Sequence, residues 1–264
     1  MPITIYQVDS FTAEPFAGNP AGVCLMESPA DEGWMQSVAA EMNLSETAFL
    51  YPDGGHYNLR WFTPLAEVPM CGHATLASAH ILYETGILPP DAEVHFETLS
   101  GRLSARRGDD LIWLDFPVTP AEPVEAPKQL IKGLGVDLEM RFVGLSSQQY
   151  LVEVDSPATL EGLQPGLVAL GELPVVGIIV TCRGEGKYDF LSRFFAPAVG
   201  IPEDPVTGSA HSTLGHYWSR HLGKRRMTAY QASARGGEVE VELRGKRIGL
   251  GGRALTVMRV ELLI

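Results

Sequence analysis

The pattern of apolar and polar residues along the chain predicts mainly short β-strands. Runs rich in β-branched and aromatic residues are separated by Gly, Asp and Pro, which is typical of strands joined by turns. The longest apolar stretch, Leu173 to Val180, predicts a buried strand. The predicted strands of the first half are 3–8, 22–26, 46–51, 57–62, 94–98, 102–106 and 111–116, and those of the second half are 150–154, 175–182, 189–195, 227–231, 238–243 and 255–262.

Few helices interrupt these strands. Residues 32–42 and 208–222 place apolar side chains at helical spacing, and a short helical piece is predicted around 129–133. Another helix is predicted from Gly72 to a stop at Gly86, and it is apolar nearly all round, as expected of a helix inside a core. Each half is therefore predicted to place many strands around one largely buried helix. Strict alternation of strands and helices is missing, which disfavours a doubly wound nucleotide-binding sheet.

Two segments of the chain share one arrangement. Residues 62–80 and 195–218 each run from Phe-x-Pro through a second proline to a Gly-x-Ala that opens a helix. The repeat predicts two lobes of one ancestry, 1–118 and 119–254, with the proline-rich stretch 117–127 as the linker. The first N–H groups of a helix lack internal partners and lie at the positive end of its dipole. Two such helix starts facing one cleft would hold a small carboxylate.

Charge and composition narrow the class of protein. The chain has 264 residues and a formal net charge of -12, which argues against binding to nucleic acid. Its longest apolar run is too short to cross a membrane, and its first residues lack the pattern of a secretory signal peptide. Three cysteines without a CxxC pair are typical of a reducing compartment. We therefore expect a cytoplasmic protein without a membrane or nucleic-acid partner.

Sequence signatures of common cofactors and metal sites are missing. The chain contains no GxGxxG, GxxxxGK[ST], GxSxG or HExxH motif. His211, His216 and His221 fall five residues apart, a spacing that does not place them on one helical face. We expect that no metal and no flavin, nicotinamide or pyridoxal cofactor is needed.

A few polar residues lie beside the repeated segments, and each has a structural and a chemical interpretation. Glu46 either caps a turn after a helix or is a desolvated carboxylate, whose pKa would rise toward the range useful for proton transfer. His73 either caps the chain or shuttles a proton at its helix start. Asp204 precedes a proline, as turn aspartates often do. Thr207 and Ser209 have the side chains of helix caps.

Several strings in order along the whole chain carry a family resemblance. VDSFTAEPFAGNPAGVC, NLSETAFL, RWFTP, CGHATLA, DPVTGSAH and QASARGG together resemble the PhzF-like (phenazine biosynthesis-like) isomerases, which share the fold of diaminopimelate epimerase. The resemblance implies an α/β (α+β) fold of two pseudo-symmetric lobes, each a bent, barrel-like sheet around a central helix, with the active site in the cleft between them. It also implies that the last strand, about 255–264, returns to the first lobe, and homodimers are common in the family.

The resemblance also implies roles for individual residues. Glu46 matches the essential acid/base glutamate, and His73 and Asp204 match cleft residues that orient the substrate and assist the proton relay. Gly72, Gly208 and Ser209 match positions at the helix starts that hold the substrate carboxylate. The implied activity is a cofactor-independent isomerase that moves a proton on a small carboxylic acid, as trans-2,3-dihydro-3-hydroxyanthranilate isomerases do.

Two alternatives to this isomerase stay open. The first is an epimerase or racemase of a small amino or hydroxy acid, with Glu46 opposed by His73 or Cys71. Epimerases of this fold use one cysteine at each helix entry, but here Cys71 has Thr207 as its counterpart. Threonine is no acid near neutral pH, so a two-thiol mechanism is not available. The second alternative is a non-catalytic protein that binds a small acid.

Overall fold

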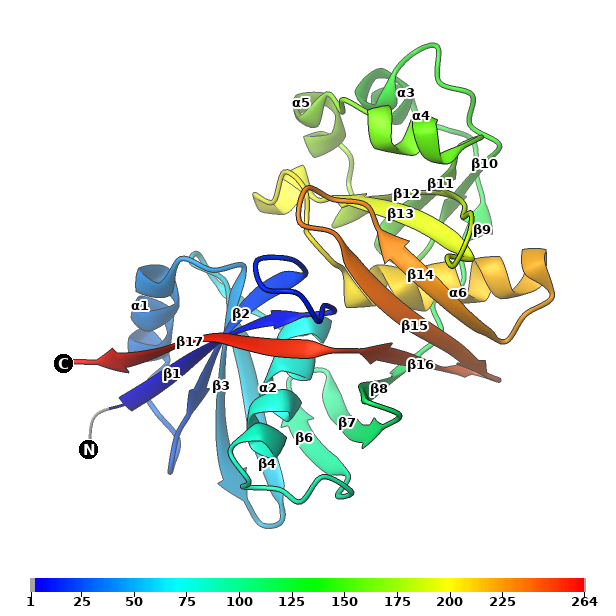
Figure 1. Ribbon diagram of the computed structural model, residues 1–264. Helices are drawn as coiled ribbons and strands as arrows, with labels where there is room; N and C mark the ends of the chain where they lie inside the picture. Colours follow the sequence, from blue (N-terminus) through cyan, green and yellow to red (C-terminus); the bar gives the residue numbers. More distant parts are fainter. Residues whose placement is uncertain (1–2, 264) are drawn as a thin grey trace. The chain divides into compact units, whose positions relative to one another are not determined.

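The computed structural model describes residues 3–263, so Met1, Pro2 and Ile264 of the predicted first lobe lie outside the described residues. The chain divides into two compact units. Unit 1 comprises Met1–Phe116 and Gly251–Ile264, and unit 2 comprises Pro117–Leu250. Each unit has its own sheet and its own buried helix, and each is described by itself below (Figure 1).

Unit 1 is built on a mixed sheet. Strand β17 pairs antiparallel with β1, β1 antiparallel with β2, β2 parallel with β3, and β3 antiparallel with β4. Strand β4 then pairs parallel with β6, and β6, β7 and β8 follow in antiparallel order. The strands are β1 (Ile3–Ser10), β2 (Asn19–Leu25), β3 (Glu46–Asp53), β4 (His56–Phe62), β5 (Glu67–Val68), β6 (Val94–Thr98), β7 (Gly101–Gly108), β8 (Leu111–Pro117) and β17 (Ala254–Leu262).

Two helices make the parallel crossovers of unit 1, because parallel neighbours cannot be joined by a tight turn. Helix α1 (Glu32–Met42) links β2 to β3 and packs on β3 and β4. Its carboxyl end is Asn43, which takes the left-handed conformation typical of a C-cap. Helix α2 (Gly72–Glu84) precedes β6 and contacts β1, β2, β3, β7 and β17, so it lies inside the curve of the sheet (Figure 1).

Burial of α2 follows from its lack of a polar face, as the sequence predicted. Eleven of its 13 residues are buried, and only His80 and Glu84 are not. Gly86, just past its end, has φ +73°, which glycine adopts at little cost. The buried polar side chains of α2 therefore need hydrogen-bond partners inside unit 1.

Unit 2 repeats this plan with shorter strands. Its strands are β9 (Glu122–Pro123), β10 (Phe142–Leu145), β11 (Gln149–Glu153), β12 (Gly177–Arg183), β13 (Phe190–Phe195), β14 (Arg226–Gln231), β15 (Gly237–Arg244) and β16 (Arg247–Gly252). Its helices are α3 (Lys128–Leu134), α4 (Pro157–Gly162), α5 (Leu167–Gly171), the 3-10 turn η1 (Pro197–Val199) and α6 (Gly208–Leu222). Ten residues of α6 are buried, and α6 contacts β14 and β15.

The order of strand pairing is the same in both units. Strands β1-β2-β3-β4-β6-β7 alternate antiparallel and parallel, and β10-β11-β12-β13-β14-β15 alternate in the same way. Helix α1 then corresponds to the α4–α5 crossover, and α2 corresponds to α6. Each lobe is a sheet around a central helix, and the predicted fold class is confirmed.

Register identifies equivalent residues in the two units. Thr47 pairs with Phe62 in unit 1, and Ile178 pairs with Phe195 in unit 2, and each phenylalanine begins the Phe-x-Pro of its segment. The residue before Thr47 is Glu46, so its equivalent in unit 2 is Gly177. The candidate acid/base position of unit 1 thus has no side chain in unit 2.

Several elements differ from the sequence-based predictions. Strands β10 and β16, the two-residue strands β5 and β9, and helices α4 and α5 were not predicted. Residues 173–176 are not a strand, because β12 begins only at Gly177, and Pro174 has no N–H to donate to a ladder. Residues 117–127 include strand β9, which pairs with β10.

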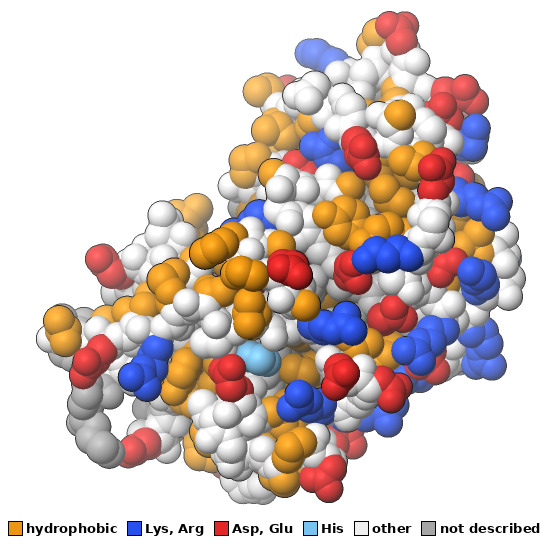
Figure 2. Space-filling model, viewed as in Figure 1, with side chains coloured by type: hydrophobic (Ala, Val, Ile, Leu, Met, Phe, Trp, Pro, Cys, Tyr) orange, Lys and Arg blue, Asp and Glu red, His pale blue; other side chains and the backbone are white. Residues whose placement is uncertain are grey.

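On the face of the molecule seen in Figure 2, acidic and basic side chains are interspersed, without one dominant basic area. Among residues 3–263, no helix combines the length and apolar character needed to cross a membrane.

His211 is a buried polar residue in the first turns of α6. It has no exposed surface, and its Nδ1 lies 2.8 Å from the carbonyl oxygen of Thr207. Its Nε2 has no hydrogen-bond partner among the described residues. Burial lowers the pKa of His211 to about 4, because an imidazolium there would lose its hydration.

Because of this pKa, we expect the free energy of unfolding to fall in acid. The folded-state pKa lies below the usual value of about 6.5, so protonation favours the unfolded chain. The contribution is fully present above about pH 6.5 and is lost as pH falls toward 4, by roughly 3 kcal/mol. Between pH 7 and 4, the unfolding free energy of His211→Gln, measured by urea unfolding, should therefore fall by less than that of the unsubstituted protein. The difference should be the contribution of His211 given above. His221→Gln, at an exposed position of the same helix, is the matched control, and equal pH slopes for all three proteins would contradict the assignment.

Candidate functional site

Glu46 is the first residue of β3, where parallel pairing sets it opposite Ala21. Only 9 % of Glu46 is exposed. Its carboxylate does not end α1, which closes at Asn43, but lies against the first turn of α2. Glu46 therefore does not cap the end of α1.

His73, the second residue of α2, is the nearest charged partner of Glu46. Its Nε2 lies 3.1 Å from Oε2 of Glu46, and the histidine is 4 % exposed. The amide Nδ2 of Asn19 lies 3.1 Å from Nδ1 of His73, and Ser45 Oγ donates to Oδ1 of that amide at 3.3 Å. In the neutral ring the Asn19 N–H donates to Nδ1, and the ring hydrogen then lies on Nε2, which faces the carboxylate.

The backbone of His73 is fixed as well. Ser10 Oγ donates to the carbonyl oxygen of His73 at 2.8 Å. Ser10 and Asn19 are both fully buried and lie on the neighbouring strands β1 and β2. Neither residue was predicted from the sequence, although both lie within VDSFTAEPFAGNPAGVC, which begins at Val8.

The charge state of His73 is set by two opposing effects. Burial lowers its pKa, but Cys71, when ionised, and the Glu46 carboxylate outweigh burial and hold the pKa of His73 above its usual range. Glu46 and a protonated His73 thus form a buried ion pair.

Cys71 is the N-cap residue of α2, yet its side chain makes no capping hydrogen bond. Its Sγ lies 3.5 Å from Nδ1 and 3.9 Å from Nε2 of His73. A helix start often lowers a thiol pKa. Here burial, followed by the charge of Glu46, raises the pKa of Cys71 to about 11, so the group is a neutral thiol near pH 7.

Glu46 keeps one oxygen available. Its Oε2 is buried and, despite its ion-pair distance to His73, has no hydrogen-bond partner among the described residues. A buried carboxylate oxygen without a hydrogen bond is costly in a folded protein. Such an oxygen is well suited to accept a proton from a bound molecule.

The predicted residues of unit 2 gather at the start of α6. Asp204 accepts a 2.5 Å hydrogen bond from Thr207 Oγ1 and is 9 % exposed. Thr207 is the N-cap residue of α6 but makes no side-chain capping bond, which corrects its prediction as a cap. Ser209 is exposed and accepts from Gln149 Nε2 at 3.3 Å. Gly208 is the buried first residue of the helix.

Gln231, at the end of β14, holds this start of α6 together. Its Oε1 accepts from the Thr207 N–H at 2.9 Å, and its Nε2 donates to the Asp204 carbonyl at 2.7 Å. The same amide lies 3.2 Å from Thr207 Oγ1, and the side chain has no exposed surface. Sequence analysis missed this residue, although it opens the string QASARGG.

Unit 1 thus brings together Glu46, Gly72 and His73, and unit 2 brings together Asp204, Gly208 and Ser209. In both units an extended N-cap residue without a capping side chain precedes the glycine that begins the buried helix. The N–H groups of these first turns therefore receive no hydrogen bond from the N-cap side chain.

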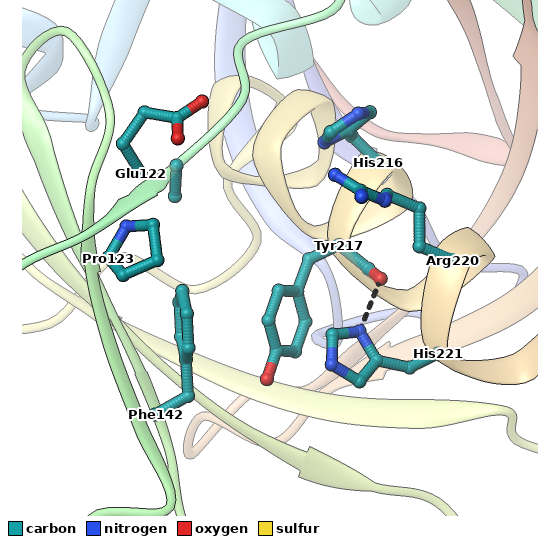
Figure 3. A pocket seen from close by; sticks show the side chains of 8 residues that line it. Glu122, Pro123, Phe142, His216, Tyr217, Arg220 and His221 are labelled. Atoms are coloured by element: carbon teal, nitrogen blue, oxygen red, sulfur yellow. Dashed lines mark hydrogen bonds between the residues drawn. The ribbon is translucent and has the colours of Figure 1, made fainter.

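A hollow of about 390 Å³ lies in unit 2 and is lined by other residues. Figure 3 shows Glu122, Pro123 and Phe142 on one side of it and four residues of α6 on the other, namely His216, Tyr217, Arg220 and His221. The Phe142 and Tyr217 rings are 4.9 Å apart, and the Tyr217 hydroxyl donates to the carboxylate of Glu153. None of the predicted site residues lines this hollow.

Comparison with known proteins identifies a family over nearly the whole chain. The model of the phenazine biosynthesis-like proteins (PhzC-PhzF) matches residues 8–260. An uncharacterized isomerase of Halalkalibacterium halodurans is 49% identical over 100% of both chains. The human phenazine biosynthesis-like domain-containing protein is 44% identical over 98% of each chain.

Solved structures agree with this match. A PhzF family phenazine biosynthesis protein of Enterococcus faecalis has a TM-score of 0.95 and 37% identity, with 100% of both chains covered. A probable proline racemase of Agrobacterium radiobacter shares the fold, with a TM-score of 0.67 and 15% identity over 99% of this chain and 93% of that chain.

The network around Gln231 gives a test of how the start of α6 is held. Gln231→Leu keeps a similar volume but leaves the Thr207 N–H and the Asp204 carbonyl unpaired in the core, so we expect a loss of about 2–4 kcal/mol of unfolding free energy. Gln36→Leu is the control, because Gln36 makes one half-buried bond to the Thr63 carbonyl and should cost about 1 kcal/mol or less. If chemical denaturation gave equal costs for the two variants, Gln231 would not hold the helix start.

Proposed function

This chain belongs to the phenazine biosynthesis-like (PhzC-PhzF) family, and we propose that it is a cofactor-independent isomerase that moves a proton between two positions of a small carboxylic acid. Several of its relatives are named isomerases, and its structural neighbours include a racemase, which supports an isomerase or epimerase in general. The finer proposal depends on the chemistry of the Glu46 site.

One observation carries the proposal. The buried Oε2 of Glu46 has no hydrogen bond, yet it lies 3.1 Å from a histidine whose ring is held by Asn19. General acid/base catalysis needs a carboxylate that can both take up and return a proton near neutral pH. A buried carboxylate next to a proton-sharing imidazole meets this requirement.

The proposed reaction uses Glu46 twice. Its Oε2 takes a proton from a carbon of the bound acid, and the electron pair of the broken C–H bond delocalises into the conjugated substrate. The resulting carboxylic acid then returns its proton to a different carbon, so atoms and charge balance without an external oxidant. His73 stabilises the carboxylate before the first transfer and after the second.

Substrate binding is assigned to the helix starts. The N–H groups that begin at Gly72 in α2 and at Gly208 in α6 are donors for a carboxylate, and Ser209 adds an exposed hydroxyl. Asp204, fixed by Thr207 and Gln231, is proposed to orient the polar groups of the substrate and assist the proton relay.

An epimerase or racemase of a small amino or hydroxy acid is the second candidate. The fold shared with a probable proline racemase and the position of Cys71 at the start of α2 favour it. The position equivalent to Cys71 is Thr207, whose hydroxyl donates to Asp204, so a second thiol is lacking. The opposing group would have to be His73 or Cys71, both of which contact each other.

Deuterium incorporation separates these possibilities. The protein is incubated in D2O with trans-2,3-dihydro-3-hydroxyanthranilate and with a panel of small amino and hydroxy acids. Deuterium at a new carbon supports the isomerase, whereas deuterium at an inverted stereocentre supports the epimerase, as chiral chromatography shows. Binding without incorporation for every acid would leave a non-catalytic binder and contradict the proposal.

Replacement of Glu46 is the sharpest test of its role. Glu46→Gln keeps the size of the side chain but removes the transferable proton, so we expect turnover to fall by roughly 10²-fold or more, with ligand binding largely retained. Glu41→Gln changes an exposed carboxylate of α1 and should leave turnover unchanged. Exchange that survives in Glu46→Gln but vanishes in Cys71→Ala would show that the thiol, rather than the carboxylate, is the base.

A further inference from the structure

Glu46, Cys71 and His73 bring three different ligand types together. One ligand atom from each lies within 4.8 Å of the other two, and all three residues are buried. No other such group of three His, Cys, Asp or Glu side chains was found in the range 3–263. A thiol, an imidazole and a carboxylate are the side chains that form three-ligand zinc sites, in which a fourth position stays open.

The distances fit a tetrahedral ion. With Zn–N and Zn–O bonds of about 2.0–2.1 Å and a Zn–S bond of about 2.3 Å, tetrahedral geometry places N and O roughly 3.3 Å apart and S and N roughly 3.6 Å apart. Nε2 of His73 is 3.1 Å from Oε2 of Glu46 and 3.9 Å from Sγ of Cys71. A carboxylate oxygen of Glu46 and Sγ of Cys71 lie within 4.8 Å of each other. Since tetrahedral geometry places O and S roughly 3.6 Å apart, side-chain movements of up to about 1.2 Å would complete the site.

A second observation points to a ligand at the same place. Oε2 of Glu46 is buried and lacks a hydrogen-bond partner among the described residues, although it faces His73. Cys71, at the N-cap of α2, makes no capping bond. Oε2 of Glu46 and Sγ of Cys71, which lies 3.5 Å from Nδ1 of His73, are thus both beside the His73 ring, and the carboxylate oxygen has no hydrogen bond.

The identity of the ligands selects the class of ion. Sulfur ligands favour zinc and similar thiophilic ions, whereas Mg²⁺ and Ca²⁺ prefer sites made only of oxygen. A divalent ion with a thiolate and a carboxylate has no net charge, which reduces the cost of burial.

We propose that Glu46, Cys71 and His73 bind Zn²⁺, and that the bound ion stops proton transfer at this site. The inhibitory part rests on the proposed function, because Zn²⁺ would occupy the carboxylate oxygen and the imidazole nitrogen that the isomerase reaction uses. The open fourth position takes water or the carboxylate of a small acid.

Binding proceeds with a defined exchange of protons. The thiol of Cys71 releases its proton to solvent as sulfur bonds to the ion. The protonated His73 ring releases its Nε2 proton to solvent and keeps the hydrogen on Nδ1, which frees the Nε2 lone pair. Asn19, turned about its amide, then accepts from Nδ1–H through Oδ1, as outer partners of zinc-bound histidines usually do.

Cobalt absorption tests the site without any assay of activity. The chelator-treated protein is titrated with Co²⁺, and a thiolate-to-cobalt charge-transfer band with tetrahedral ligand-field bands is expected at one equivalent. Zn²⁺ should displace the cobalt. Cys71→Ser should abolish the band and weaken Zn²⁺ binding by more than the roughly 10–100-fold that loss of an outer partner costs.

The other cysteines provide matched controls. Cys24 and Cys182 are also free and buried, so Cys24→Ser and Cys182→Ser should keep the band if they keep the fold, as judged by thermal unfolding. Absence of the band in the unsubstituted protein, or its persistence in Cys71→Ser, would overturn the zinc site.

Deuterium exchange then separates the two proposals. Zn²⁺ should suppress exchange in the unsubstituted protein and chelator should restore it, and any exchange that Cys71→Ser retains should be insensitive to Zn²⁺. A cobalt band with unimpaired exchange would keep the metal site and overturn its inhibitory role. Exchange that depends on Glu46 but shows no cobalt band would keep the isomerase and overturn the metal site. Activity that chelator removes and Zn²⁺ restores would make the ion a cofactor and contradict both proposals.

Discussion

Burial of most of one helix inside each sheet is the constraint on which the rest of this structure depends. The parallel pairs β4–β6 and β13–β14 require crossovers, and α2 and α6 make them from within the cores of their units. Helix α2, which has no polar face, can present polar groups to a ligand only at its ends. In both units the candidate residues lie at the first turn of the buried helix, where N–H groups without internal partners must be satisfied.

The residue on the strand beside the helix start differs between the two units. In unit 1 the strand beside the helix start contributes Glu46, whereas its equivalent in unit 2 is Gly177. A Cβ at Gly177 would lie 2.2 Å from the Phe194 ring, so aromatic packing in unit 2 leaves no room for a side chain at this position. The two units therefore share helix starts that suit anion binding, whereas the Glu46–His73 pair is found in unit 1.

The sequence predicted the three long helices through local periodicity. It predicted the fold class and the family through short sequence strings that match the family. It did not predict α4 or α5, which span only six and five residues, or β16, whose RIGLGG offers little β-branched or aromatic signal. Glu46 and His73 were named through resemblance, but their contact is tertiary. Asn19 and Gln231 were not predicted, because each amide forms its hydrogen bonds with residues that are distant in sequence.

The return of the chain to unit 1 has a consequence for how the protein forms during synthesis. Strand β1 pairs with β2 on one side and with β17 on the other, and β17 is made only after the whole of unit 2. The whole of unit 2 is translated between these two partners, so unit 2 can fold while β1 still has an open edge. Unpaired strand edges invite pairing with other chains. The interval between residues 117 and 254 is thus the period in which the nascent chain is most exposed to misassembly.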